Sequence, residues 1–63
     1  MTNIRVERAK KDISQSFLAQ QLEVNLVTVQ RIERNTTIPS VYLAWKIAKY
    51  FNLEINDFEE FNY

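Results

Sequence analysis

The side chains that could act in catalysis in this sequence are carboxylates, lysines, tyrosines and hydroxyls, because cysteine and histidine are both absent. Their absence excludes disulfides, thiolate metal ligands and nucleophiles activated by an imidazole base. A metal site built from carboxylates alone would need regularly spaced acids, and no spacing of the EF-hand kind occurs. We therefore expect no enzyme activity, no metal site, no cofactor and no small-molecule ligand.

The charged side chains are distributed unevenly, although the net charge of the 63 residues is zero. All eight basic residues lie between Arg5 and Lys49, in a stretch that holds four acids and so nets +4, whereas residues 50–63 carry four acids and no base. The basic region could contact the phosphate groups of a nucleic acid while the acidic end points away from them. The same charges could instead only solvate a surface.

The length and composition predict one small globular domain over residues 1–63, with 46% hydrophobic and 25% charged residues. A domain of this size buries only about 60% of the surface that its unfolded chain exposes, so an oligomer interface would add useful stability. No apolar run approaches the length of a membrane span, and Met1–Arg5 lacks the apolar core of a secretory signal. We expect neither membrane insertion nor export.

Apolar periodicity predicts five short helices, at about residues 3–11, 15–22, 26–34, 41–51 and 55–61. The sequence has no glycine, so the helix starts are indicated by Ser14, Asn25 and Ser40, which are good N-caps. Only residues 23–25 separate the second and third helices, which must therefore cross steeply. The expected fold is a compact all-α, five-helix domain with a helix-turn-helix at about residues 15–34.

Several short motifs follow one another along the chain: Ile13-Ser14-Gln15, Leu18-Ala19, Val24-Asn25, Thr28-Val29, Arg31-Ile32-Glu33-Arg34, Pro39-Ser40 and Lys46-Ile47-Ala48-Lys49-Tyr50-Phe51. Together they resemble the Xre/Cro/repressor family of helix-turn-helix transcriptional regulators, over about residues 4–59. The resemblance implies a lambda-repressor-like fold, a double-stranded DNA operator as partner, a homodimer and a cytoplasmic regulator, which we expect to be a repressor.

In such regulators the third helix enters the major groove, so the resemblance implies DNA contacts from both helices of the motif and from the loop that follows. Gln15 matches a family glutamine at a helix N-terminus, where phosphate is favoured. Arg31 could pair with guanine and Gln30 with adenine, although Arg31 could also form a surface salt bridge or contact phosphate. The expected contact residues are Gln15, Ser16, Asn25, Leu26, Val27, Thr28, Gln30, Arg31, Arg34, Asn35, Thr36 and Thr37.

Leu26 and Val27 depart from the polar or basic residues usual in the family at these positions. They could contact thymine methyl groups. The alternative is a patch for a protein, in which case the chain would be an interaction module or anti-repressor that keeps the fold without binding DNA.

The resemblance also implies structural roles for residues outside the reading surface. Arg8 and Glu33 match a buried salt bridge between the first and third helices. Glu23 and Asn35 stand where the family has glycine, so both are expected in the left-handed backbone conformation.

Most of the aromatic residues lie in the second half of the chain. Phe58, Phe61 and Tyr63 are expected to help form a two-fold dimer interface, although Phe58 could equally cap a small core. Trp45 is expected to join the core stripe of the fourth helix, because relatives carry an apolar residue there.

Overall fold

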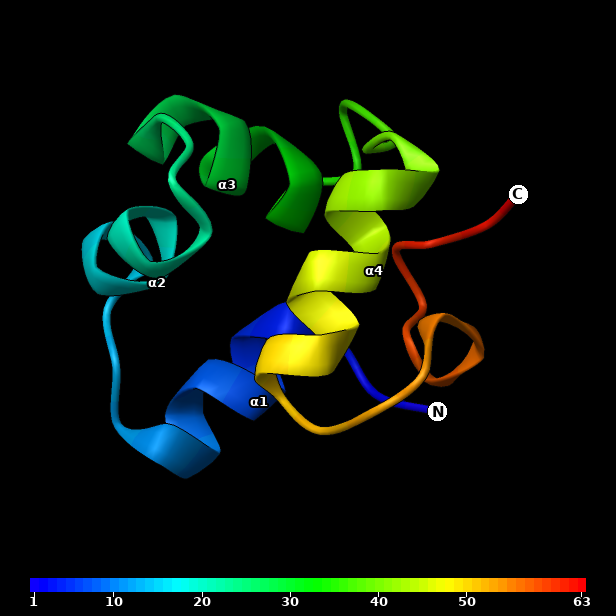
Figure 1. Cartoon of the computed structure of the whole chain (residues 1–63), viewed down its shortest axis with the longest axis horizontal. Helices are drawn as coiled ribbons and strands as arrows, with labels where there is room; N and C mark the ends of the chain where they lie inside the picture. The colour runs from blue at the N-terminus through cyan, green and yellow to red at the C-terminus, as the bar shows by residue number, and fades with distance from the viewer.

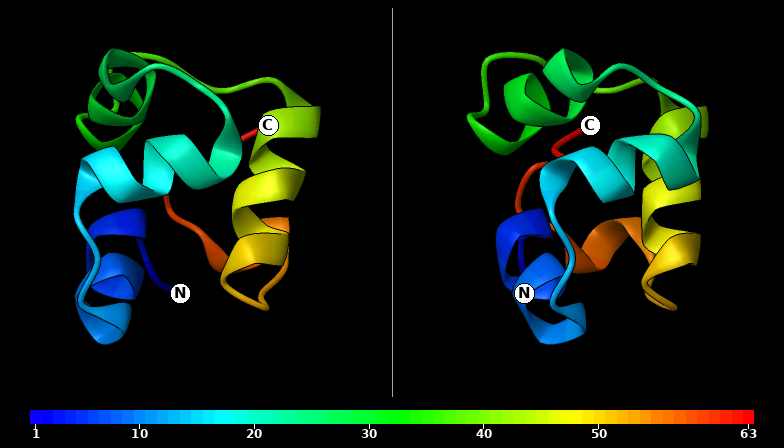
Figure 2. Two further views of the ribbon diagram at one scale, coloured as in Figure 1. Left: turned by 60° about the vertical axis from the view of Figure 1, so that its left-hand side comes forward. Right: turned by 90° about the vertical axis from the view of Figure 1, so that its left-hand side faces the viewer.

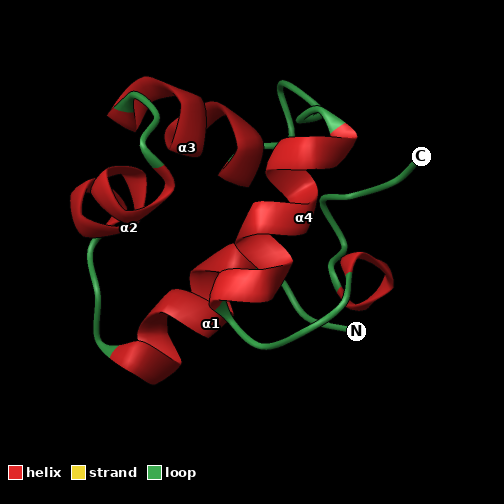
Figure 3. Cartoon of the chain, in the orientation of Figure 1, coloured by secondary structure: helices red, strands yellow, loops and turns green.

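The computed structural model describes residues 1–63 as four α-helices and one 3₁₀ turn (Figure 1). The elements are α1 (Ile4–Lys11), α2 (Gln15–Leu22), α3 (Leu26–Glu33), α4 (Val41–Tyr50) and the 3₁₀ turn η1 (Ile55–Asp57). No β-strand is present (Figure 3), so the all-α class predicted from the sequence is confirmed. The predicted count of five helices is wrong, because η1 replaces the helix expected at residues 55–61.

The chain after η1 is held extended by a single β-bridge between Thr2 and Phe58. The Thr2 N–H donates to the Asp57 carbonyl at 2.7 Å, and the Glu59 N–H donates to the Thr2 carbonyl at 2.8 Å. These bonds satisfy the backbone groups that a fifth helix would have paired internally. The N-terminal segment therefore competes successfully with helix formation here.

Three of the four helices begin at a side chain that caps free N–H groups. Asn3 accepts from the Val6 N–H at 2.9 Å, Ser14 from the Phe17 N–H at 3.0 Å, and Ser40 from the Leu43 N–H at 3.1 Å. Asn25 occupies the N-cap position of α3, as predicted, but its side chain makes no capping hydrogen bond.

Left-handed residues follow helices α1 to α4 at positions that glycine usually fills. Their φ angles are 55° at Asp12, 60° at Glu23, 61° at Asn35 and 62° at Asn52. The prediction for Glu23 and Asn35 is confirmed, and Asp12 adds a position that the sequence did not indicate. Glu23 has the least suitable side chain of the four for this conformation.

One hydrophobic core unites all the elements. Helix α2 lies between α1 and α3, and α4 packs along their side (Figure 2). The core consists of twelve buried side chains: Ile4, Leu18, Ala19, Leu22, Val29, Ile32, Ala44, Ile47, Ala48, Phe51, Phe58 and Phe61.

The aromatic residues are placed differently from the prediction. Phe58 and Phe61 are only 2% and 6% exposed, because the segment after η1 directs both rings into the core, where they pack at 4.9 Å between centroids. Phe58 thus takes the core position that the sequence left open as its alternative, Phe61 is buried as well, and of the three residues expected at a dimer interface only Tyr63 is exposed. Trp45 is 50% exposed and lies outside the core stripe of α4.

Candidate nucleic-acid interface

Helices α2 and α3 are joined by a tight turn over residues 23–25. With Glu23 left-handed, its N–H and that of Val24 turn back to the Gln20 and Ala19 carbonyls, at 3.2 and 3.0 Å. Lys46 of α4 donates to the Leu22 carbonyl at 2.8 Å, which pairs a further group at the end of α2. These bonds within the turn and from α4 fix the conformation of the turn. They therefore also fix the angle at which α2 and α3 cross.

A side-chain network ties three helices together at the other end of α3. Arg8 of α1 donates from Nε to Glu33 Oε2 at 2.7 Å and from its Nη2 atom to Glu33 Oε1 at 3.0 Å. The Glu33 side chain is only 1% exposed, so the expected buried pair is present. Gln15 of α2 donates to the same Glu33 Oε1 at 3.1 Å. Because a two-point arginine–carboxylate pair is geometrically specific, Glu33 fixes α3 against both neighbours.

The outward face of α3 presents a stripe of exposed residues. Val29 and Ile32 point into the core at 2% and 1% exposure, which leaves the opposite face to solvent. Val27 and Arg31 are exposed and four residues apart, with the exposed Arg34 three residues further on, so they follow one helix face. Leu26 is 38% and Val27 49% exposed.

The start of α2 offers free backbone donors. Ser14 caps the Phe17 N–H, while the N–H groups of Gln15 and Ser16 have no acceptor within the chain. Such groups, with the positive end of the helix dipole, favour an anion. Apart from its bond to Glu33, the Gln15 amide has no partner in the chain.

The loop after α3 is shaped by Asn35 and held by Thr36. The Thr36 hydroxyl and N–H both donate to the Arg31 carbonyl, each at 3.0 Å. Asn35 and Thr37 are exposed, and neither side chain has a partner within the chain. With Arg34, the loop offers one formal positive charge.

The acidic end of the chain lies closer to this loop than its separation in sequence suggests. Glu59 and Glu60 line the same polar hollow of about 130 Å³ as Glu33 and Asn35, with Arg5 as the one base. Glu60 is 6% exposed and accepts the Ile4 N–H at 2.9 Å through Oε2, while Oε1 is buried without a partner. Burial raises the pKa of Glu60 above the usual carboxyl range.

All the residues expected from the sequence to contact DNA are exposed or half-buried. They belong to the start of α2, the turn, the outer face of α3 and the following loop. Sequence reasoning missed the bond between Gln15 and Glu33 and the cap that Lys46 supplies. Neither has a local signal, because each joins residues 18 or more positions apart.

The structure contains no cluster of acidic, histidine or cysteine side chains arranged to hold a metal ion. None of its helices is both long and apolar enough to cross a bilayer.

Comparison with known proteins agrees with this geometry. The sequence pattern of the helix-turn-helix family matches residues 4–58. A protein of Archaeoglobus fulgidus, described as an uncharacterized HTH-type transcriptional regulator, is 41% identical over 56 residues, covering 89% of this chain and 80% of its own length. A protein of Methanocaldococcus jannaschii with the same description is 39% identical over 54 residues, covering 86% of this chain and 82% of its own length.

Proposed function

Because this chain belongs to the Xre/Cro-type helix-turn-helix family of transcriptional regulators, we propose that it represses transcription by binding a palindromic operator as a homodimer. Helix α3 enters the major groove, and the start of α2 rests on the phosphate backbone. The observation that carries the proposal is the exposed stripe of Val27, Arg31 and Arg34 on a helix whose other face is anchored in the core.

The residues of α3 contact DNA bases in two ways, through hydrogen bonds and through apolar contacts. Arg31 is exposed and placed to pair with guanine, and Gln30, half-buried, reads adenine. Leu26 and Val27 contact thymine methyl groups, which suits two exposed apolar side chains beside an arginine. Asn25 adds a polar contact at the start of the helix, because its side chain is not used as a cap.

Phosphate contacts surround this reading surface. The free N–H groups of Gln15 and Ser16 and the Gln15 amide bind the backbone on one side, and residues 34–37 bind it on the other. Gln15 also joins the network that orients α3, so backbone contact and base reading are mechanically linked. Such a repressor acts in the cytoplasm, where bacterial and archaeal DNA lies.

A dimer places two copies of α3 about one helical turn apart, at about 34–36 Å. Operator half-sites with this spacing are expected on one face of the duplex. The chain of 63 residues carries few basic contacts per copy, so pairing of half-sites raises the affinity that one copy alone would lack.

The test is selection of bound fragments from sheared DNA, followed by gel shift at low and high salt. We expect an inverted repeat with the stated spacing, bound with an affinity that falls steeply with salt, by about 0.9 in log–log slope for each phosphate neutralised. No binding even at low salt would contradict the proposal and favour a protein partner for Leu26 and Val27.

A further inference from the structure

The middle of the loop after α3 is not held by its own contacts. The backbone groups of Thr37 and Ile38 make no hydrogen bond within the chain. Both residues are exposed, Ile38 to 59%, so burial does not hold their side chains either. The position of this stretch therefore depends on how the two ends of the loop are fixed.

Each end of the loop is fixed by a different residue. On the α3 side, Thr36 bonds twice to the Arg31 carbonyl. On the α4 side, Pro39 is buried, and its carbonyl accepts no backbone N–H. The Tyr63 hydroxyl donates to this carbonyl and lies 3.2 Å from the Ser40 carbonyl. Tyr63 is thus the only residue outside the loop and α4 that hydrogen bonds to this end.

Tyr63 reaches the loop because the segment after Phe58 runs back to the start of α4 (Figure 2). Phe61 is buried in the core, so the chain is anchored two residues before Tyr63. The Tyr63 side chain itself is 61% exposed and adds little to the core. Burial of its hydroxyl raises the pKa of Tyr63 above the usual value, so the hydroxyl stays protonated and can donate at neutral pH.

We propose that Tyr63 is a positioning residue for DNA binding, because its hydroxyl fixes the α4 side of the loop and so holds the free Thr37 N–H where a phosphate can accept from it. The inference rests on the proposed function, in which residues 34–37 contact the phosphate backbone. A group that is fixed in advance loses less conformational entropy when it binds. Without the Tyr63 bond the loop must be ordered by the DNA itself, and binding weakens.

The first experiment compares Tyr63→Phe with the original chain in the absence of DNA. The substitution keeps the ring and removes only the hydroxyl. Nitrogen-15 relaxation should show lower order parameters at the Thr37 and Ile38 amides, but not at Thr36, whose own bond to α3 is unchanged. Tyr50→Phe, at the other end of α4, is the matched control, since the tyrosine hydroxyl bonds within the chain all belong to Tyr63.

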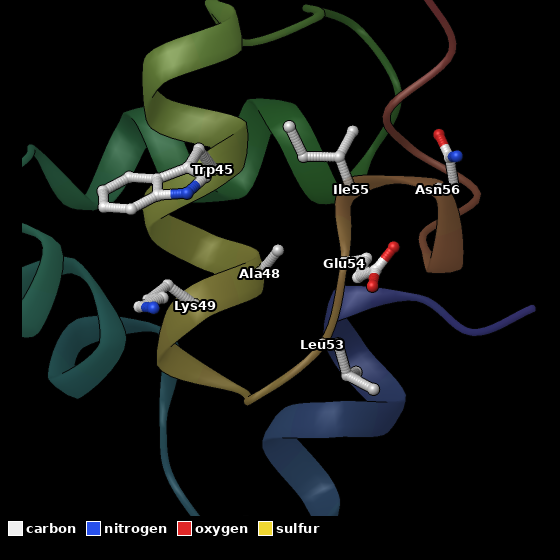
Figure 4. A pocket seen from close by; sticks show the side chains of 7 residues that line it. All are labelled: Trp45, Ala48, Lys49, Leu53, Glu54, Ile55 and Asn56. Carbon is white, nitrogen blue, oxygen red and sulfur yellow. The ribbon is translucent and has the colours of Figure 1, made fainter.

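A tryptophan outside the loop reports whether the variants remain folded. Trp45, the only tryptophan of the chain, lines an open hollow between α4 and the segment that leads into η1 (Figure 4). The other walls include Leu53 and Ile55 and no residue of the loop after α3. We expect the same Trp45 emission in Tyr63→Phe as in the original chain. A changed emission would overturn the proposal, because the hydroxyl would then support the whole fold and not the loop.

The second experiment measures binding to the selected operator by fluorescence anisotropy. Tyr63→Phe should raise the dissociation constant about threefold to tenfold, the effect of one lost hydrogen bond, and Tyr50→Phe should leave it unchanged. Single phosphates are then replaced by neutral methylphosphonates. The phosphates at which Arg34→Ala abolishes the effect of this replacement are those that the loop contacts. Their replacement should weaken binding of the original chain more than binding of Tyr63→Phe, whereas other phosphates should affect both chains equally.

Unchanged order parameters at Thr37 and Ile38 in Tyr63→Phe would overturn the inference. So would an unchanged affinity, or a loss spread evenly over all phosphates, which would indicate a general weakening of the structure. The two experiments also separate the inference from the proposed function. An original chain that binds no DNA overturns the proposed function, while relaxation still decides whether Tyr63 holds the loop. Equal binding by the original chain and Tyr63→Phe supports the function and overturns the role of Tyr63.

Discussion

Gln15 and Glu33 are hydrogen bonded, with Gln15 Nε2 donating to Glu33 Oε1 at 3.1 Å. Gln15 begins α2 and Glu33 ends α3, so the bond spans the whole helix-turn-helix. Glu33 is in turn held by Arg8 of α1. Gln15, a residue expected to touch DNA, is thus linked to α1 through two successive side-chain contacts. The orientation of α3 thus depends on one nearly buried carboxylate.

Removal of Arg8 should test that dependence. Arg8→Ala leaves the Glu33 charge buried without its partner, so we expect the free energy of unfolding to fall by about 3–5 kcal/mol. Urea titration followed by circular dichroism measures this loss. Arg5→Ala, at an exposed arginine of the same helix that forms no ion pair, is the control. Equal effects of the two substitutions would show that the network contributes little.

Glu23→Gly should stabilise the fold. Glu23 has φ 60°, a conformation that costs a residue with a side chain about 1–2 kcal/mol, and glycine avoids this cost. Thermal unfolding should show a higher melting temperature, by about 4–8 °C for each kcal/mol gained. Asn35→Gly provides the comparison and should gain less, because asparagine tolerates the same geometry better. A melting temperature that is unchanged or lower for Glu23→Gly would contradict this account.

Val27 should make binding sensitive to a single methyl group of DNA. Replacing the contacted thymine by uracil in the selected operator should weaken binding about fourfold, the value of one buried methyl group. The Val27→Ala variant should lose this sensitivity at that position. Val6→Ala, which shortens a similarly exposed valine on α1, should retain it. Indifference of the original chain to uracil at every thymine would argue against the methyl contact.

Glu59 should weaken DNA binding through its position beside the loop after α3. It is exposed and shares a hollow with Asn35, so Glu59→Gln removes a negative charge near an expected phosphate contact. We expect about twofold tighter binding at low salt and little change at high salt. Fluorescence anisotropy with labelled operator measures both. Asp12→Asn, at the C-cap of α1 and outside the hollow that Glu59 shares with Asn35, removes the same charge and should have no effect.

Glu60 should give the fold a distinctive pH dependence. Because burial raises the pKa of Glu60 in the folded chain above its unfolded value, ionisation of Glu60 opposes folding. That cost is absent below the unfolded pKa, grows as pH rises toward the folded pKa and is complete above it. Glu60→Gln should therefore be more stable than the original chain at neutral pH, and this advantage should disappear in acid.

The comparison must be made as a difference between the two chains. Glu7 titrates in the opposite sense, since the Thr2 hydroxyl that donates to it at 2.7 Å lowers the pKa of Glu7. Its contribution is common to both chains and cancels. An advantage of Glu60→Gln that is constant from acid to neutral pH would exclude this role.

The sequence predicts the four α-helices closely because their signals are local. Ser14 and Ser40 cap the helices they precede, and apolar periodicity identifies Leu18, Val29 and Ile47 as core residues. The predicted fifth helix fails because its competitor is distant. Thr2 takes the backbone groups of Asp57 and Glu59, and no local pattern around Phe58 reports that partner.

The exposed surface of α3 and the contacts that orient it are predictable from the sequence only in part. The exposed face of α3 follows from helix period, once Val29 and Ile32 are assigned to the core. The links of Gln15 and Lys46 to other helices depend on tertiary packing and lie beyond any window along the chain.

The bridge between Thr2 and Phe58 has a consequence for the motions of the molecule. Terminal segments usually fray, and their amide hydrogens exchange with solvent through small local openings. Here the Thr2 N–H is bonded to Asp57 and the Ile4 N–H to the buried carboxylate of Glu60. Both amides are thus tied to the segment around η1 that holds Phe58 and Phe61 in the core. Hydrogen exchange at Thr2 and Ile4 should therefore be as slow as in the interior of α4, reporting the opening of the whole fold.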